Sequence, residues 1–565
     1  MKAPAAPPRV GAFTTLAVSG LAGYLNRGWR FNIDARWVAG VSALAAATVG
    51  FAWGTHVAGG SDSYCYLSQA ELFAAGHIVN SQPLAAIAPW ERGADAFVPV
   101  GHVPVLSHPG ATAPMCPPGY PILMALARTV GGRSAMFAVV PLLGALAVWA
   151  TFLLGRRVAG PAAGALAAWL LTASPPFLYQ VVQPMTDVPA AAMWAVALVV
   201  VSDRRFASSA RGAMLGGIAV GAALLIRPNL VPVAGVAALA VFIERPLRWR
   251  DVLRTWAGFG AGILPFVLVV AALQNAMYGS PLKSGYGDLD FLFRIDHVWP
   301  NLQRYPAWLL QTETPIVLFA LASPWLANSQ TRRRQRVWLL GFIAAIFVCY
   351  IPYEVFDAWW YLRFLLPAYP ALLALTAAAV VGGLSWLSKP WRALGLAAVA
   401  VIAVFLVRGA IDGHAFGLRD FERRFRLAGE YVDSQLPKNA AIVTAHESGS
   451  VRFYSGRVTV TWRALPADGF DRALEFLRAQ GYRPYLLLEH WEQPEFVRQF
   501  EGKTMLGGLG WPPIADINHE VRIYDPDDFL RYRAGIPVRT DRIWNFRGRR
   551  RQISMLQHGR TEIRP

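Results

Sequence analysis

The sequence predicts a polytopic α-helical membrane protein with about eleven spans and a C-terminal α/β domain. Three observations support this prediction. Of the 565 residues, 55% are hydrophobic, only 16% are charged, and the mean hydropathy is +0.35, whereas a soluble protein has about 25% charged residues. Apolar runs of roughly 15–25 residues, the length that suits membrane helices, recur over residues 37–409. Residues 410–565 instead mix short apolar strands with helices.

The apolar runs give the expected spans in chain order. Residues 1–36 are basic and lack the apolar run and small-residue cleavage site of a signal peptide, so we expect a cytoplasmic N-terminus and a retained anchor. Residues 37–409 then form one transmembrane domain with long external loops at 58–133 and 278–314. The spans are expected near residues 37–57, 134–154, 158–178, 188–202, 212–226, 229–243, 255–277, 315–328, 337–353, 364–384 and 392–409.

Lys and Arg residues predict the orientation. Short cytoplasmic connections are enriched in these residues, and they gather in six alternate connections while the intervening short ones have almost none. An odd number of spans places the C-terminal domain outside the cytoplasm, and we expect a multi-pass protein of the inner (plasma) membrane. The clusters also account for much of the net charge of +18, so no nucleic-acid partner is expected. They comprise Lys2 to Arg36, Arg156-Arg157, Arg204 to Arg211, Arg245 to Arg254, Arg332 to Arg336, and Lys389 with Arg392.

The C-terminal domain, residues 410–565, is expected to be an α/β fold. It contains no Walker A or GxGxxG motif in a strand–helix context, so a nucleotide loop is not predicted. Beyond Asp528 the chain is rich in arginine, with ten Arg and two acids between Arg531 and Arg564. This tail either binds anionic lipid or an acidic glycan, or is a solvated segment. Helices are expected at 418–436, 470–480 and 491–500, and strands at 440–445, 458–462, 485–489 and 521–524.

The three cysteines have no metal-ligand spacing. Cys65 and Cys116 share the predicted oxidising side, where they either form a disulfide or leave Cys65 on the apolar side of a helix. Cys349 lies within a predicted span.

Several first-loop side chains have metal-ligand chemistry without a standard spacing. A divalent metal ion is therefore left open as a cofactor, and solvated loop residues are the alternative. The side chains are His56, Glu91, Asp95, His102 and His108.

Two aspartates at external helix ends are the strongest chemical signal. Asp62 follows the first span directly, before a segment with an apolar stripe that predicts a short interfacial helix. Asp187 lies at the next external turn. Each acid either caps a helix or faces a common cavity, where such a pair can supply a general base or bind a metal.

Four motifs together resemble the GT-C superfamily of membrane glycosyltransferases, most closely its protein mannosyltransferase and aminoarabinose transferase branch. The resemblance covers residues 37–385. Ser63 follows Asp62 where such enzymes often have an Asp-Glu pair, which leaves open whether a second acid is needed. The motifs are Ser61-Asp62-Ser63-Tyr64, Pro117-Pro118-Gly119-Tyr120-Pro121, Met185-Thr186-Asp187-Val188-Pro189, and the segment from Tyr361 to Pro370 with its RxLLPxxP pattern.

The resemblance implies transfer of a hexosyl or pentosyl group from a polyprenyl-phosphate donor to a glycan, lipid or protein acceptor, with inversion at C1. Asp62 is the implied base, and Asp187 orients its partner or the acceptor. A leaving phosphate needs cationic or N–H donors. Arg363 lies where a lipid phosphate would lie, Arg227 departs from the positive-inside trend, and Lys283 lies in an external glycine-rich turn.

Tyr64, beside Asp62 in the first motif, is a further candidate for substrate binding. The arginines and the lysine have an alternative role as snorkelling residues at the membrane surface.

Two other functions compete with transfer. A transporter or flippase for a lipid-linked or anionic substrate would favour ionisable residues near mid-span and internal repeats, neither of which the sequence shows. A scaffold that presents the C-terminal domain leaves the four charged residues on one side unexplained.

Overall fold

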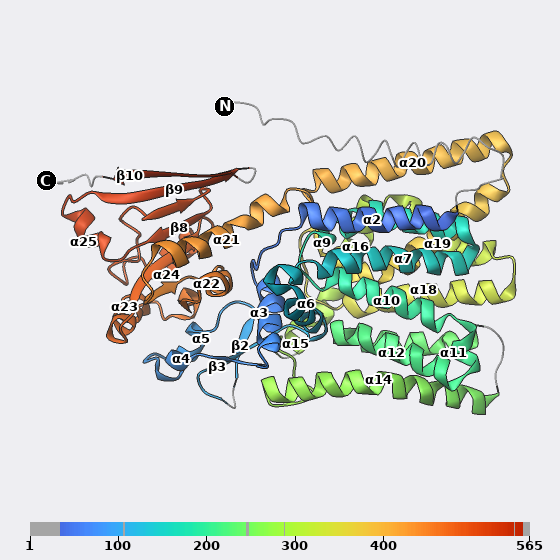
Figure 1. The fold of residues 1–565 in the computed structure, drawn as a ribbon, viewed down its shortest axis with the longest axis horizontal. Helices are drawn as coiled ribbons and strands as arrows, with labels where there is room; N and C mark the ends of the chain where they lie inside the picture. Colours follow the sequence, from blue (N-terminus) through green and yellow to red (C-terminus); the bar gives the residue numbers. More distant parts are fainter. Residues whose placement is uncertain (1–33, 106–107, 244–247, 288, 547–548, 558–565) are drawn as a thin grey trace.

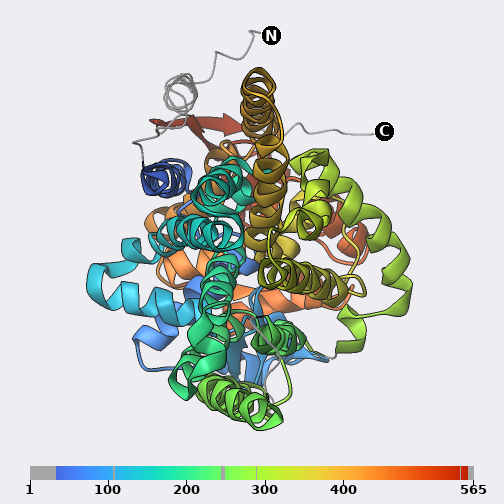
Figure 2. The same ribbon diagram turned by 90° about the vertical axis from the view of Figure 1, so that its right-hand side faces the viewer.

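The computed structural model describes residues 34–105, 108–243, 248–287, 289–546 and 549–557. The expected cytoplasmic N-terminus, residues 1–33, lies outside the described residues. A bundle of long helices occupies one half of the molecule and an α/β domain the other (Figure 1). Many bundle helices are seen nearly end-on after a 90° turn, so they run along a common direction (Figure 2).

The bundle contains α-helices and short 3₁₀ segments in the order of the predicted spans. Its α-helices are α2 (Ala35–Trp53), α7 (Val139–Ala159), α8 (Pro161–Ala173), α9 (Pro175–Val181), α10 (Asp187–Val201), α11 (Arg204–Ser208), α12 (Ala210–Ile226), α13 (Val231–Ala238), α14 (Trp249–Tyr278), α17 (Phe319–Ala322), α18 (Gln330–Tyr350), α19 (Tyr369–Ser385) and α20 (Lys389–Asp412). Its 3₁₀ helices are η1 (Pro228–Leu230), η2 (Leu239–Phe242), η4 (Pro315–Leu318), η5 (Ser323–Leu326) and η6 (Trp359–Ala368).

All eleven predicted apolar runs coincide with these helices. Among the described residues, five helical segments are long and apolar enough to cross a membrane, and five shorter ones have 10–17 residues. The remaining run lies in α18, which has 21 residues and begins with a basic segment. The fold is therefore that of a helical membrane protein, while the count of eleven spans stays a prediction.

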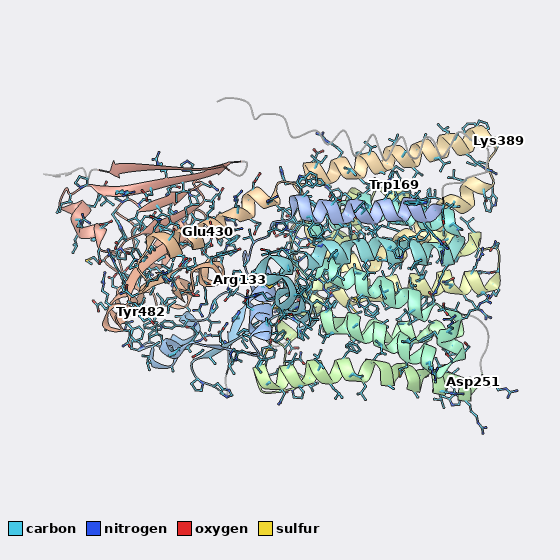
Figure 3. The ribbon with its side chains drawn as sticks, in the orientation of Figure 1. Arg133, Trp169, Asp251, Lys389, Glu430 and Tyr482 are labelled. Atoms are coloured by element: carbon cyan, nitrogen blue, oxygen red, sulfur yellow. A yellow bond between two sulfur atoms is a disulfide. The ribbon has the colours of Figure 1, made fainter. Side chains whose placement is uncertain are left out.

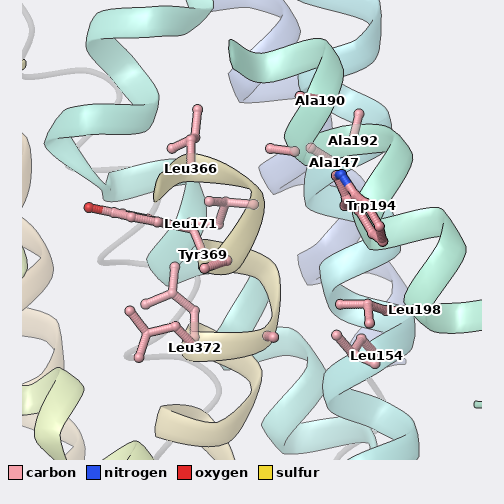
Figure 4. Close-up of a cluster of buried hydrophobic side chains, with 14 of the residues drawn as sticks. Ala147, Leu154, Leu171, Ala190, Ala192, Trp194, Leu198, Leu366, Tyr369 and Leu372 are labelled. Atoms are coloured by element: carbon pink, nitrogen blue, oxygen red, sulfur yellow. The ribbon is translucent and has the colours of Figure 1, made fainter. Parts of the chain in front are cut away.

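Helix α7 lies at the centre of the bundle and packs on α2, α8, α10 and α19. The core there combines small and large side chains, such as Ala147 and Leu154 of α7 with Trp194 of α10 (Figure 4). Small residues let helices approach closely where lipid supplies no hydrophobic driving force. A Cβ added at Gly155 of α7 would lie 2.9 Å from Gly164 of α8, so this crossing needs both glycines.

The basic connections gather at the bundle end far from the α/β domain. Arg157, in the last turn of α7 rather than in a loop, pairs with Asp203 at 2.7 Å. Arg336 of α18 donates to the carbonyl oxygens of Ser323 and Val158. Asp251 and Lys389 lie at the same end (Figure 3). This common end is what the positive-inside pattern requires of one membrane side.

The first loop and the later external loop form a layer between the bundle and the α/β domain. Their helices are α3 (Asp62–Ala74), α4 (Pro83–Ile87), α5 (Gly93–Ala96), α6 (Gly119–Met136), α15 (Leu289–Leu292), η3 (Ile295–His297) and α16 (Val298–Glu313). A small antiparallel sheet has the order β1-β3-β2, with β1 (Asn80–Ser81), β2 (His102–Pro104) and β3 (Ala111–Pro114).

Helix α3 is the predicted helix after the first span, but it is buried on most sides instead of lying open at the interface. A disulfide joins Cys65 of α3 to Cys116 at the end of the first loop. The bridge closes the loop that carries Asp62, and Cys349 is free.

The α/β domain is built on a mixed sheet of seven strands in the order β10-β9-β7-β8-β6-β4-β5. Strands β4, β5 and β6 are parallel, and β8 and β7 continue the sheet antiparallel. The strands are β4 (Ala440–Val443), β5 (Val458–Val460), β6 (Arg483–Glu489), β7 (Ala515–Ile517), β8 (Val521–Tyr524), β9 (Val538–Phe546) and β10 (Arg549–Gln557). The helices are α21 (Leu418–Gln435), α22 (Ser448–Ser455), η7 (Trp462–Ala464), α23 (Gly469–Ala479), α24 (Gln493–Phe500) and α25 (Asp528–Arg533).

The predicted α/β class is thus present, and the expected helices and strands all form. The arginine-rich tail differs from the solvated alternative, because residues 538–557 form a hairpin that extends the sheet. Val538, Thr540 and Ile543 are buried and alternate with more exposed positions. Its basic composition concealed this pattern.

The first loop shares a hydrophobic core with the α/β domain. Leu84 and Phe97 of the loop pack with residues of α23 and α24. The Thr461 hydroxyl donates to the carbonyl of Val98 at 3.1 Å, and the amide of Val100 donates to the Ser448 hydroxyl at 3.0 Å. The loop is therefore held from both sides, by the bundle and by the domain.

The orientation can be tested by thiol labelling. In a Cys349→Ser background, Glu475→Cys on the exposed side of α23 should react with a membrane-impermeant thiol reagent in intact spheroplasts. Lys389→Cys, exposed at the opposite end of the bundle, should react only after lysis. The reverse pattern would overturn the predicted orientation.

Candidate active site

Asp62 and Arg363 form an ion pair where the bundle meets the first loop. Asp62 is the first residue of α3 and Arg363 belongs to η6. Arg363 Nη2 lies 2.9 Å from Asp62 Oδ2, and the two side chains are 17% and 36% exposed, respectively. Ser61, not Asp62, occupies the cap position of α3, so the described partner of this carboxylate is a guanidinium.

Arg363 has unused hydrogen-bonding capacity. Its Nη1 contacts the thioether sulfur of Met185 at 3.5 Å, which is a weak acceptor. Its buried Nε has no hydrogen-bond partner among the described residues. A buried N–H group without a partner is costly, so Arg363 presents donors that an anion would satisfy.

Asp187 and Arg227 form a second ion pair that is buried. Asp187 begins α10 and is 1% exposed, while Arg227 follows α12 and is 7% exposed. Arg227 Nη2 donates to Asp187 Oδ1. Its Nη1 donates to the Tyr350 hydroxyl at 3.3 Å and to the Phe364 carbonyl at 3.4 Å. This guanidinium is neutralised and fixed, as the membrane interior requires of a charge.

The two pairs are joined through the segment before α10 and through η6. Phe364 follows Arg363, and its ring lies 5.1 Å from the Arg363 guanidinium carbon and 5.9 Å from that of Arg227. On the other side, the Tyr66 and Thr186 hydroxyls are 3.0 Å apart. Burial raises the pKa of Tyr66, and the charge of Asp62 raises it further, so its hydroxyl stays protonated. The four charged residues therefore belong to one site.

Sequence reasoning did not identify the tyrosines of this site. Burial raises the pKa of Tyr286, and Tyr66 and Asp62 raise it further, which places its hydroxyl close to the charged pair. Tyr286 comes from the 278–314 loop, where Gly285 packs directly against the backbone of Met115. The signal available was a tyrosine between glycines in an external loop.

Two predicted residues are not brought into the site. Lys283 is exposed in the turn after α14. Tyr64 is buried, stacks on His102 with ring centroids 5.2 Å apart, and touches Gly449 of the α/β domain. Its environment is that of a packing residue between the first loop and the domain.

The first-loop side chains considered as metal ligands are separated. His102 is buried and contacts the Ser68 hydroxyl at 2.9 Å, and burial lowers its pKa to about 3. Asp95 pairs with Arg92. Over the described ranges, no group of three or more His, Cys, Asp or Glu side chains is arranged to hold a metal ion.

Comparison with known proteins identifies the fold. Residues 115–273 match the family model described as dolichyl-phosphate-mannose-protein mannosyltransferase. No curated protein sequence matches the chain. The apo oligosaccharyltransferase of Archaeoglobus fulgidus superposes with a TM-score of 0.57 and 13% identity, covering 86% of this chain and 74% of that chain.

A second similar structure is ArnT from Cupriavidus metallidurans bound to undecaprenyl phosphate. It superposes with a TM-score of 0.52 and 13% identity, covering 87% of this chain and 96% of that chain. The chain therefore has the membrane fold of the GT-C glycosyltransferases, as the sequence motifs predicted.

The buried pair can be distinguished from the partly exposed pair by stability. Asp187→Asn should lower the free energy of unfolding by about 3–5 kcal/mol, because it leaves the Arg227 guanidinium buried without a counter-charge. Asp62→Asn, the same chemical change at a partly exposed pair, should cost about 1 kcal/mol or less. Thermal unfolding of the detergent-solubilised variants measures both effects, and equal losses would contradict this assignment.

Proposed function

We propose that the chain is an inverting glycosyltransferase that moves a sugar from a polyprenyl-phosphate donor to an acceptor hydroxyl or amine on the extracytoplasmic side of the inner membrane. The observation that carries the proposal is the Asp62–Arg363 pair, which places a carboxylate beside a guanidinium with an unpartnered N–H. The ArnT structure with undecaprenyl phosphate, and an archaeal oligosaccharyltransferase structure with a dolichol-phosphate, support a lipid phosphate as ligand.

Arg363 is the proposed ligand of the donor phosphate. A phosphate oxygen is a far stronger acceptor for a guanidinium than the Met185 thioether is. Arg363 lies in η6, at the bundle end that meets the external layer, where the headgroup of a membrane-embedded donor would lie. When phosphate takes part of the guanidinium, the Asp62 carboxylate is released for chemistry.

Asp62 is the proposed general base. It accepts the proton of the acceptor O–H or N–H while the acceptor atom forms a bond to C1 of the sugar. The bond from C1 to the phosphate oxygen breaks on the opposite face, and its electron pair leaves on the polyprenyl phosphate. Charge therefore grows on the phosphate next to Arg363, where a positioned cation lowers the barrier.

Asp187 and Arg227 have a positioning role in this proposal. Arg227 is already neutralised by Asp187, so it offers little net charge to a phosphate. Its contact with the Phe364 carbonyl holds the backbone next to Arg363. Asp187 thus orients the partner of Asp62 through Arg227, and direct phosphate binding is left to Arg363.

The test is an assay of purified protein with a panel of radiolabelled polyprenyl-phosphate hexoses and pentoses and candidate acceptors. We expect consumption of one donor and appearance of label in an acceptor. Folded protein that leaves every donor intact, but moves a fluorescent lipid-linked sugar across proteoliposomes, would instead favour a flippase.

Asp62→Asn should lower transfer by at least about 100-fold, because the amide keeps the size of the side chain but cannot accept the proton. Thermal unfolding of the same preparation shows whether the protein is intact. Near-normal turnover of the folded variant would exclude Asp62 as the base.

Arg363→Lys should also impair transfer, because the ammonium keeps the charge but loses the planar fork that reaches Asp62 and phosphate together. A higher KM for the donor would mean that Arg363 holds phosphate in the ground state, and a lower kcat that it acts mainly as charge develops. Wild-type donor kinetics for both Arg363→Lys and Arg363→Ala would refute the phosphate role.

A further inference from the structure

The α/β domain has a topological switch point between β4 and β6. Strand β5 lies on one side of β4 and β6 on the other, all three parallel. The connection from β4 to β5 contains α22, which packs on one face of the sheet, and that from β5 to β6 contains α23, which packs on the opposite face. In open α/β sheets, ligands bind at the carboxyl ends of the strands at such a point.

A histidine and a glutamate occupy these two strand ends. Glu489 is the last residue of β6, and His446 follows β4. His446 Nδ1 and Glu489 Oε1 are 2.6 Å apart. Glu489 is buried and also accepts from Trp491 Nε1 at 2.7 Å and from Arg424 Nε at 3.3 Å. Burial opposes ionisation of Glu489, but the His446 hydrogen bond and Arg424 outweigh it and hold its pKa low.

An ionised Glu489 fixes the tautomer of a neutral His446. Because the carboxylate only accepts, Nδ1 carries the proton and Nε2 presents a lone pair. The His446 side chain is 31% exposed. No described residue forms a hydrogen bond with Nε2, whereas the backbone N–H of His446 is held by Glu492 at 3.0 Å. The ring is oriented, and one nitrogen is left for a ligand.

This nitrogen faces the segment that carries Asp62. A Cβ added at Gly60, two residues before Asp62, would lie 3.8 Å from His446 Nε2. A Cβ added at Gly59 would lie 2.5 Å from Glu422 Oε2 of α21, so that approach needs glycine. The switch point of the domain therefore opens towards the proposed base.

We propose that His446 and its surroundings form an acceptor subsite that binds a sugar ring. This inference rests on the proposed function. His446 Nε2 accepts a hydrogen bond from one sugar hydroxyl while another hydroxyl reaches Asp62. Trp491 packs edge-on against His446 with ring centroids 5.4 Å apart and is partly exposed. Together with the partly exposed Phe421, it supplies apolar surface for the C–H face of a sugar.

His446 binds substrate directly in this proposal, and Glu489 is a positioning residue. The test uses methyl hexosides and methyl pentosides as acceptors with the radiolabelled donor that the wild-type protein consumes. His446→Gln and Glu489→Gln should each raise the KM for the glycoside by about tenfold or more, the cost of one lost hydrogen bond. Asp62→Asn should instead lower kcat.

His490→Gln is the matched control, because His490 is the next residue after β6 and its side chain is exposed. It should keep wild-type kinetics, and all variants should show the wild-type unfolding temperature. A folded His446→Gln variant with the wild-type KM for every glycoside would overturn the acceptor subsite, although transfer itself would stand.

A second measurement does not need turnover. Diethyl pyrocarbonate should modify His446, and a binding methyl glycoside should slow that modification at least about threefold, as followed by mass spectrometry of the peptide. Protection without donor consumption would support the sugar site and contradict the transferase proposal. Absence of protection by any glycoside would overturn the sugar site.

Discussion

The ion pair between Asp62 and Arg363 joins parts of the chain that are 301 residues apart. Asp62 belongs to the external layer, and Arg363 belongs to the bundle. An isolated charge at this depth would be expensive, so each residue constrains the position of the other. The pair is only partly buried. Its members can therefore exchange partners with a ligand at moderate cost, which a fully buried pair cannot do.

The neighbouring pair shows the other extreme of the same physics. Asp187 and Arg227 are both nearly inaccessible, and the guanidinium also binds the Tyr350 hydroxyl and the Phe364 carbonyl. Removing either charge would leave the other unpaired in an apolar environment. The two pairs share the aromatic ring of Phe364. One pair thus behaves as a fixed support, and the other as the reactive part of the site.

The α/β domain is not a separate appendage of the bundle. The first loop contributes Leu84 and Phe97 to its core, and the Cys65–Cys116 bridge ties the loop back to α3. Tyr454 of α22 accepts the backbone N–H of Ala58 at 2.9 Å, just before the segment that carries Asp62. The position of Asp62 therefore depends on packing in the domain as well as in the membrane, which is why an acceptor subsite on the domain can act on it.

Much of the candidate site was predictable from the sequence. Hydrophobic runs and basic connections predicted the helical class and the common end of the basic clusters. Asp62, Asp187, Arg227 and Arg363 were recognisable because charges at the outer ends of apolar runs are costly and need a reason. Tyr66 and Tyr286 were not, since a tyrosine near a membrane surface is most often part of an aromatic belt.

The sequence by itself determined which residue types and which helices are present, because hydrophobicity and helix periodicity are local properties. Only the tertiary structure decided how the charges pair. Asp187 neutralises Arg227, 40 residues away, and Arg363 pairs with Asp62. Likewise, only the strand order places His446 beside Glu489 and opposite Gly60. These partners depend on how distant helices and strands meet, and the free energy of pairing two desolvated charges depends on a separation of a few ångströms that no local pattern encodes.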